Sequence, residues 1–250
     1  MDVVIPTSPE EAVTAFGSGS GVTVVGGGTI VVPEITYGRL TPNKVLMLTR
    51  SGLDHVTREG GTVTIGAAAP VSALEALDEP LASAARHLGD REVRAQATVG
   101  GNLCAVHAGE APRGDLQAPL ITLGAQVRST GEGGERTEPV EDFLAGANGR
   151  LVLDVAYDEA ERKATYVAAR RPHSHHYTIL AVAATKTNGE LRVAATGLGP
   201  QAVRLIGVEQ SRDPDGALQG VELSDDALAS AWYRSKVLPR LVERVLSEVT

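Results

Sequence analysis

The sequence predicts an α+β protein built as two lobes. The chain has 250 residues, which is enough for two hydrophobic cores because single domains commonly hold about 100–150 residues. Helix-like and strand-like segments follow one another along the chain, and two turn signals, at 131–134 (Gly-Glu-Gly-Gly) and at Asn188-Gly189, are typical of antiparallel hairpins. The hydrophobic residues are mainly Ala, Val and Leu, with only two Phe and one Trp, so we expect an aliphatic core with few rings for a flat ligand to stack on.

The first helix is expected directly after Thr7. Ser8 is suited to the N-cap, Pro9 to the first helical position, and Glu11 to the capping-box position, so this helix should run to about Phe16. Hydrophobic alternation, apolar runs and turn residues then predict the remaining elements in chain order. They are strands at 22–25, 44–48 and 61–68, helical segments at 71–77, 80–88 and 116–123, strands at 126–129, 135–140, 151–157, 164–169, 178–187 and 190–196, and two closing helical segments.

Composition excludes several classes of function. The formal net charge is -8 and no run of Lys or Arg is present, so a nucleic-acid partner is not expected. No stretch approaches the roughly 20 apolar residues of a membrane span, and the start lacks the features of a signal peptide, so we expect a cytoplasmic protein without membrane insertion. Cys104 is the only cysteine, which excludes a disulfide framework and any iron–sulfur cluster held by this chain alone.

The first informative feature is a glycine loop after the strand predicted at 22–25. Gly26, Gly27 and Gly28 bring bare backbone N–H groups together, which is one way to hold a pyrophosphate, and Thr29 adds a hydroxyl donor. The spacing does not fit the Rossmann fingerprint, and Val-Val-Pro at 31–33 does not resemble a helix start. For this loop taken alone, a tight structural turn is the favoured interpretation.

A second glycine-rich segment changes that balance. Residues 98–102, Thr-Val-Gly-Gly-Asn, again offer clustered N–H donors with hydroxyl and amide side chains, about 70 residues after the first loop. Two such loops suit a dinucleotide with two phosphates and several sugar hydroxyls. Asp115, at the start of the helix predicted at 116–123, can accept hydrogen bonds from ribityl or ribose hydroxyls, although the N-cap of that helix is a nearly equal alternative.

Several motifs in order resemble one family. They are Val-Val-Gly-Gly-Gly-Thr at 24–29, Val-Thr-Ile-Gly-Ala at 63–67, Gly-Asp-Arg-Glu-Val-Arg-Ala-Gln-Ala-Thr-Val-Gly-Gly-Asn-Leu at 89–103, Asp-Leu at 115–116 and Leu-Gly-Ala at 123–125. This set is similar to the FAD-binding (medium) subunit of molybdenum hydroxylases, a group that includes the carbon monoxide dehydrogenase flavoprotein and the FAD domain of xanthine dehydrogenase. The resemblance runs from about Pro6 to Gly199.

The resemblance implies a fold and a cofactor. The fold is a two-subdomain FAD-binding fold (PCMH-type) at 1–158, with subdomains at about 1–55 and 56–158, followed by a C-terminal α+β domain at 159–250 with a three-stranded antiparallel sheet and helices. The cofactor is FAD. The residues implied to bind it are Val25, Gly26, Gly27, Gly28, Thr29 and Ile30 at the pyrophosphate, Thr98, Gly100, Gly101 and Asn102 at phosphate and sugar, Leu88 near the isoalloxazine, Asp115 at the polar chain, and Tyr166 as a ring neighbour.

Three functions remain open from the sequence. In the first, the chain is an electron-transfer subunit in which FAD passes electrons from partner iron–sulfur and molybdopterin subunits to a terminal acceptor. In the second, it is a stand-alone FAD-dependent oxidase or dehydrogenase with His176 or Tyr166 as base. In the third, the loops are structural and the chain is an assembly module. No metal site is expected, because His173, His175 and His176 have no second ligand cluster.

Overall fold

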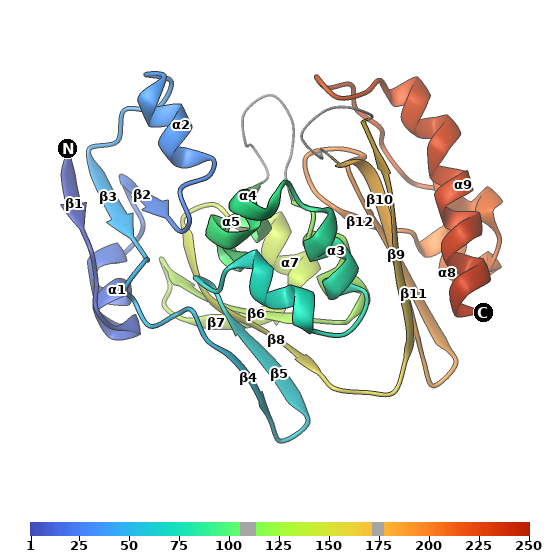
Figure 1. Cartoon of the computed structure of the whole chain (residues 1–250), viewed down its shortest axis with the longest axis horizontal. Coiled ribbons are helices and arrows are strands. Elements are labelled where there is room, and N and C mark those ends of the chain that lie inside the picture. The colour runs from blue at the N-terminus through green and yellow to red at the C-terminus, as the bar shows by residue number, and fades with distance from the viewer. Residues whose placement is uncertain (106–113, 172–177) are drawn as a thin grey trace. The chain divides into compact units, whose positions relative to one another are not determined.

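The computed structural model describes residues 1–105, 114–171 and 178–250 and has the mixed helix and strand content that the sequence predicts (Figure 1). The chain divides into two compact units, which are described separately. Unit 1 is made of Met1–Ala73, Glu92–Cys104 and Ala125–Glu159, and unit 2 of Leu74–Arg91, Ala105–Gly124 and Ala160–Thr250. Each unit is therefore assembled from three separate stretches of sequence.

Unit 1 begins with a small parallel sheet and a helix on one of its faces. Its strands are β1 (Asp2–Val4), β2 (Val22–Val25) and β3 (Lys44–Met47), in the order β1-β3-β2. Helix α1 (Pro9–Phe16) starts as predicted, with the Ser8 hydroxyl accepting from the N–H of Glu11 at 3.2 Å. Phe16 of this helix packs with Leu46 of β3 and Leu153, which secures the first sheet within unit 1.

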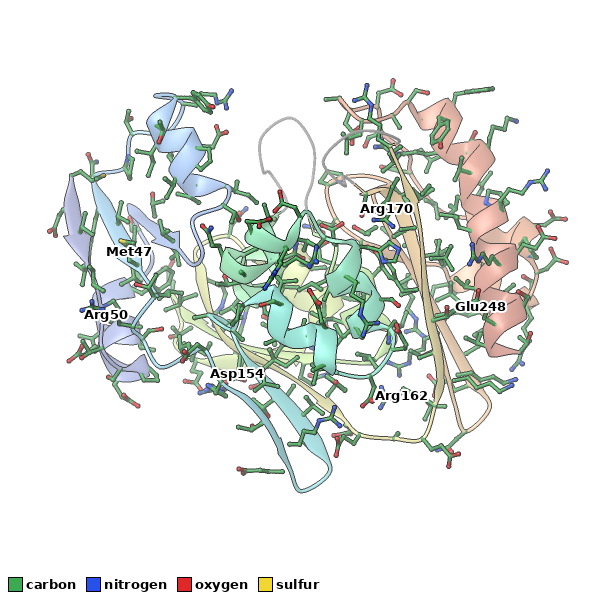
Figure 2. The ribbon with its side chains drawn as sticks, in the orientation of Figure 1. Met47, Arg50, Asp154, Arg162, Arg170 and Glu248 are labelled. Atoms are coloured by element: carbon green, nitrogen blue, oxygen red, sulfur yellow. The ribbon has the colours of Figure 1, made fainter. Side chains whose placement is uncertain are left out.

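The rest of unit 1 is a five-stranded antiparallel sheet with short helices. The strands are β4 (Val56–Glu59), β5 (Thr62–Gly66), β6 (Gln126–Gly131), β7 (Arg136–Pro139) and β8 (Arg150–Asp158), in the order β4-β5-β8-β6-β7. The short helices are α2 (Val31–Thr36), α4 (Arg91–Gln96), α5 (Val99–Leu103) and α7 (Val140–Ala145). Within the sheet, the buried carboxylate of Asp154 (Figure 2) accepts from Arg128 Nε at 2.8 Å.

Unit 2 contains a four-stranded antiparallel sheet. Its strands are β9 (Lys163–Arg170), β10 (Thr178–Thr187), β11 (Glu190–Thr196) and β12 (Val203–Arg204), in the order β12-β11-β10-β9. The resemblance implied three strands here, and the fourth, β12, contributes only two residues. The turn between β10 and β11 is the predicted Asn-Gly hairpin, with φ of 51° at Asn188 and 86° at Gly189.

Helices cover both faces of the unit 2 sheet. The C-terminal helix α9 (Ala231–Val249) packs Leu238 and Val242 on one face, and its Glu248 (Figure 2) accepts from the hydroxyl of Thr165. On the opposite face, α6 (Gln117–Thr122) is held by the Thr185 hydroxyl, which donates to the carbonyl of Thr122 at 2.7 Å. The remaining helices are η1 (Val71–Ala76), which continues from unit 1 into unit 2, α3 (Leu81–His87), α8 (Ile206–Ser211) and η3 (Pro214–Leu218).

Within the described residues, no helix combines the length and the apolar composition that crossing a membrane requires.

Candidate cofactor site

The first glycine loop connects β2 to α2 in unit 1. Val25 is buried at the end of β2, and Gly28 has a φ of +75°, a conformation that glycine adopts without the steric cost other residues carry. The sequence analysis expected no helix at 31–33, and this was wrong, because α2 begins at Val31. Pro33 is compatible with it, because backbone N–H groups in the first turn of a helix have no acceptor within the helix.

The backbone N–H groups of this loop are available to a ligand. Among the described residues, none of the N–H groups of Gly26, Gly27, Gly28, Thr29 and Ile30 donates a hydrogen bond to the protein, and all five residues are partly exposed. Successive N–H groups gathered in a loop form a concave site for an anion. The first loop therefore has the donors that a pyrophosphate needs.

The second glycine loop uses its N–H groups differently. The N–H of Val99 donates to the carbonyl of Ala69 at 3.0 Å, and that of Gly100 donates to Ala67 at 2.8 Å. The N–H of Gly101 donates to the Thr98 hydroxyl at 3.2 Å, which makes Thr98 the N-cap of α5. The expectation of clustered N–H donors was therefore wrong for residues 99–102, whose N–H groups the chain itself satisfies. In the described protein the N–H of Thr98 donates no hydrogen bond, and the Thr98 hydroxyl hydrogen is a second available donor.

The structure brings the two loops into direct contact within unit 1. A Cβ atom added to Gly27 would lie 1.6 Å from the carbonyl oxygen of Gln96, and one added to Gly26 would lie 2.3 Å from Thr98 Oγ1. The sequence analysis did not find this contact or assign a role to Gln96. One sequence offers little signal for it, because the partners are about 70 residues apart and glycine at 26 and 27 is equally consistent with a turn.

The other three residues implied to bind FAD lie in unit 2. Leu88 follows α3 as its C-cap and is buried. Asp115 is partly buried just before α6, whose N-cap position is Leu116, without a side-chain cap bond, so the alternative of Asp115 as N-cap was wrong. Tyr166 is buried in β9, and its ring meets the edge of the His87 ring at a centroid distance of 5.5 Å.

Burial sets the protonation of this pair. The Tyr166 hydroxyl is buried and makes no hydrogen bond of normal geometry in the part of the chain that the structure describes, although the Thr178 hydroxyl lies near it. Burial, and then the nearby charge of Asp115, raise the pKa of Tyr166 well above its usual value. Burial lowers the pKa of His87, whose Nδ1 lies 2.7 Å from the carbonyl of Ser83 and must therefore carry a hydrogen. Both side chains are neutral at pH 7.

The histidine cluster at 173, 175 and 176, which includes the candidate base His176, lies outside the described residues. Among the residues that the structure does describe, no group of three or more His, Cys, Asp or Glu side chains is arranged to hold a metal ion.

Sequence comparison identifies the family. Residues 1–156 match the family described as the FAD binding domain in molybdopterin dehydrogenase. The carbon monoxide dehydrogenase medium chain of Hydrogenophaga pseudoflava is 25% identical, over 97% of this chain and 94% of the relative. The 6-hydroxypseudooxynicotine dehydrogenase complex subunit alpha of Paenarthrobacter nicotinovorans is also 25% identical, over 99% of this chain and 94% of the relative.

Solved structures show the same fold. A chain of the carbon monoxide dehydrogenase from Hydrogenophaga pseudoflava superposes with a TM-score of 0.84 at 22% identity, covering 100% of this chain and 96% of that chain. A chain of the reconstituted enzyme from Oligotropha carboxidovorans gives 0.87 at 21% identity, covering 100% and 97%. This chain belongs to the family of FAD-binding domains found in molybdopterin dehydrogenases, and FAD is its cofactor.

Proposed function

We propose that this chain holds FAD and passes electrons from partner iron–sulfur and molybdenum centres to a terminal acceptor. The observation that carries the proposal is the row of N–H groups from Gly26 to Ile30, which have no acceptor among the described residues in a chain of an FAD-binding family. When bound, FAD supplies a centre that takes up and releases electrons singly or in pairs. The residues of this chain bind and orient it.

Individual residues contribute in different ways to this proposal. The free N–H groups of residues 26–30 bind the pyrophosphate, and the Thr98 hydroxyl donates to phosphate or sugar. Gly100, Gly101 and Asn102 border the sugar. In unit 2, Leu88, Asp115 and Tyr166 serve the isoalloxazine and the polar chain. The assignment of 1–158 to the FAD-binding domain, with subdomains at about 1–55 and 56–158, and of 159–250 to a C-terminal domain remains part of the prediction.

The partners are proposed to be an iron–sulfur subunit and a molybdopterin subunit. Two relatives of nearly full coverage are named as a medium chain and as a subunit of a dehydrogenase complex. The single cysteine, Cys104, cannot hold an iron–sulfur cluster by itself. The centres that reduce the flavin therefore belong on other polypeptides. We place the assembly in the cytoplasm, as the sequence analysis expects.

The second candidate function is a stand-alone FAD-dependent oxidase or dehydrogenase. Of its two candidate bases, Tyr166 is poorly suited, because its raised pKa keeps the hydroxyl protonated at neutral pH and a general base must be deprotonated. The role of base in that reading rests on His176 alone. The raised pKa of Tyr166 therefore favours the electron-transfer function.

The visible spectrum of the purified chain tests the proposal. The chain should retain FAD when purified alone, and anaerobic mixing with small organic donors should leave that flavin oxidised. Turnover by the isolated chain would support the stand-alone enzyme instead. A colourless protein that also fails to bind added FAD would support the non-catalytic assembly module.

Co-expression tests the partners. The chain should form a stable complex with an iron–sulfur subunit and a large molybdopterin subunit encoded beside it, and the substrate of that complex should reduce the flavin of this chain. A chain that associates with neither subunit contradicts the electron-transfer function.

A further inference from the structure

The second glycine loop is anchored firmly within unit 1. Backbone hydrogen bonds join it to the segment after β5, from Val71 N–H to Ala97 at 2.8 Å, from Val99 to Ala69 at 3.0 Å, and from Gly100 to Ala67 at 2.8 Å. Pro70 and Thr98 also form an isolated antiparallel bridge. The first loop is touched by Thr98 and by Gln96, the last residue of α4.

Backbone hydrogen bonds hold the first loop through its carbonyl groups, with Gly28 accepting from the N–H of Val32 at 3.1 Å and Ile30 from that of Glu34 at 3.3 Å. Its five N–H groups make no hydrogen bond to the described protein, and the helix that follows it, α2, has no buried residue. Gly26 and Gly27 lie so close to Thr98 Oγ1 and the Gln96 carbonyl that neither has room for a Cβ atom. Contact with the protein itself is therefore sufficient to require glycine at both positions, with or without a ligand.

We propose that Gln96 and Thr98 are positioning residues for the first glycine loop. They pack against Gly26 and Gly27. This contact holds the N–H groups of the first loop in the geometry that binds pyrophosphate. This inference rests on the proposed function and deepens it. It assigns to Gly26 and Gly27 a contact with protein, and assigns ligand binding to the N–H groups of residues 26–30, which have no acceptor in the described protein.

A double-mutant cycle tests the contact between Gly26 and Thr98. Gly26→Ala alone should weaken binding of FAD to the apo-protein by about tenfold or more, since a Cβ would overlap Thr98 Oγ1. On a Thr98→Ala background the oxygen is gone and Thr98 Cβ is 3.4 Å away. There, Gly26→Ala should cost less than about threefold in affinity. The urea midpoint of the apo-protein should show the same rescue.

Two matched variants complete the experiment. Thr98→Ser keeps the hydroxyl oxygen that a Cβ atom at residue 26 would overlap, so it should not restore the FAD affinity or the urea midpoint of Gly26→Ala. Gly27→Ala meets the backbone carbonyl of Gln96, so Thr98→Ala should not rescue it either.

Additive effects of Gly26→Ala and Thr98→Ala in both affinity and urea midpoint would overturn the proposal. Rescue of the midpoint without rescue of FAD affinity would also overturn it, because the contact would then be structural only. A wild-type protein that does not bind FAD refutes the proposed function, while the urea midpoints still decide whether the contact exists.

Discussion

The two glycine loops are alike in sequence and different in structure. In the first loop the N–H groups of residues 26–30 have no acceptor in the described protein, whereas in the second the N–H groups of Val99, Gly100 and Gly101 are all satisfied by the chain. Glycine content indicates that backbone can approach something closely, but not whether that something is a ligand or another segment of protein. In the described protein the first loop keeps its N–H groups free for a ligand, and the second uses its own to pair with the chain.

Substitution of Gly27 tests the contact at its tightest point. Gly27→Val places its Cβ atom 1.6 Å from the Gln96 carbonyl oxygen, and the required shift should destabilise the apo-protein by about 2–3 kcal/mol and abolish FAD retention. The measurements are the urea midpoint of the apo-protein and the flavin content after purification. Gly146→Val is the control in unit 1, because its Cβ atom meets nothing closer than the Arg136 guanidinium at 3.4 Å. A variant of normal apo stability that lacks flavin would instead show that the space at Gly27 is needed only for phosphate.

Substitutions of Thr98 test its role as the N-cap of α5. Thr98→Val removes the acceptor for the Gly101 N–H and should destabilise the apo-protein by about 1 kcal/mol, as expected for a lost N-cap. Thr98→Ser keeps the acceptor and should retain most of the stability. Thermal unfolding of the two apo-variants makes the comparison, and equal losses would contradict the capping role.

Tyr166 in unit 2 extends the distinction between paired and unpaired polar groups. Its hydroxyl, like the N–H groups of the first loop, makes no hydrogen bond of normal geometry to the described residues, but unlike them it is buried. Tyr166→Phe should leave the apo-protein as stable as before or more stable by up to about 1 kcal/mol. Loss of more than that in chemical denaturation would mean that the hydroxyl is bonded. FAD affinity of the same variant measures whether the cofactor uses it.

The smallest expected effect is a dependence of stability on pH at His87. Because burial lowers the pKa of His87 in the folded protein, the unfolded chain binds more protons between that value and the ordinary value of 6.5. The contribution of neutral His87 to stability is therefore complete above pH 6.5 and is lost as the pH falls below it. Urea midpoints of wild type and His87→Gln between pH 5 and 8 should diverge only in the acidic range, whereas parallel curves would contradict the shift.

Local signals predicted much of the fold. The Ser8 cap and Pro9 predicted the start of α1, and Asn188-Gly189 predicted the hairpin between β10 and β11, because each depends on residues close in sequence. Strand β1 was not predicted. It has three residues, and it exists because it pairs with β3, with Val3 beside Val45, a contact that no local pattern encodes.

The site was predicted in part for the same reason. The glycine runs and the family resemblance identified both loops, but two N–H groups of the second loop are satisfied by Ala67 and Ala69, which lie about 30 residues before it. Helix α4 was not expected, and with it the approach of the Gln96 carbonyl to Gly27 was missed. Whether an N–H group is already hydrogen-bonded depends on the folded chain. The sequence therefore located the two loops but did not show which of their N–H groups are free to bind a ligand.

The path of the chain through its two units bears on how the protein folds during synthesis. The chain passes from one unit to the other at 73/74, 91/92, 104/105, 124/125 and 159/160. Domains usually fold as units in the order of translation, but unit 1 lacks its central strand β8 until residue 158 has been made. The first glycine loop at residues 26–30 must therefore wait for more than half of the chain to leave the ribosome before unit 1, which contains it, is complete. No single cut releases either unit as a continuous fragment.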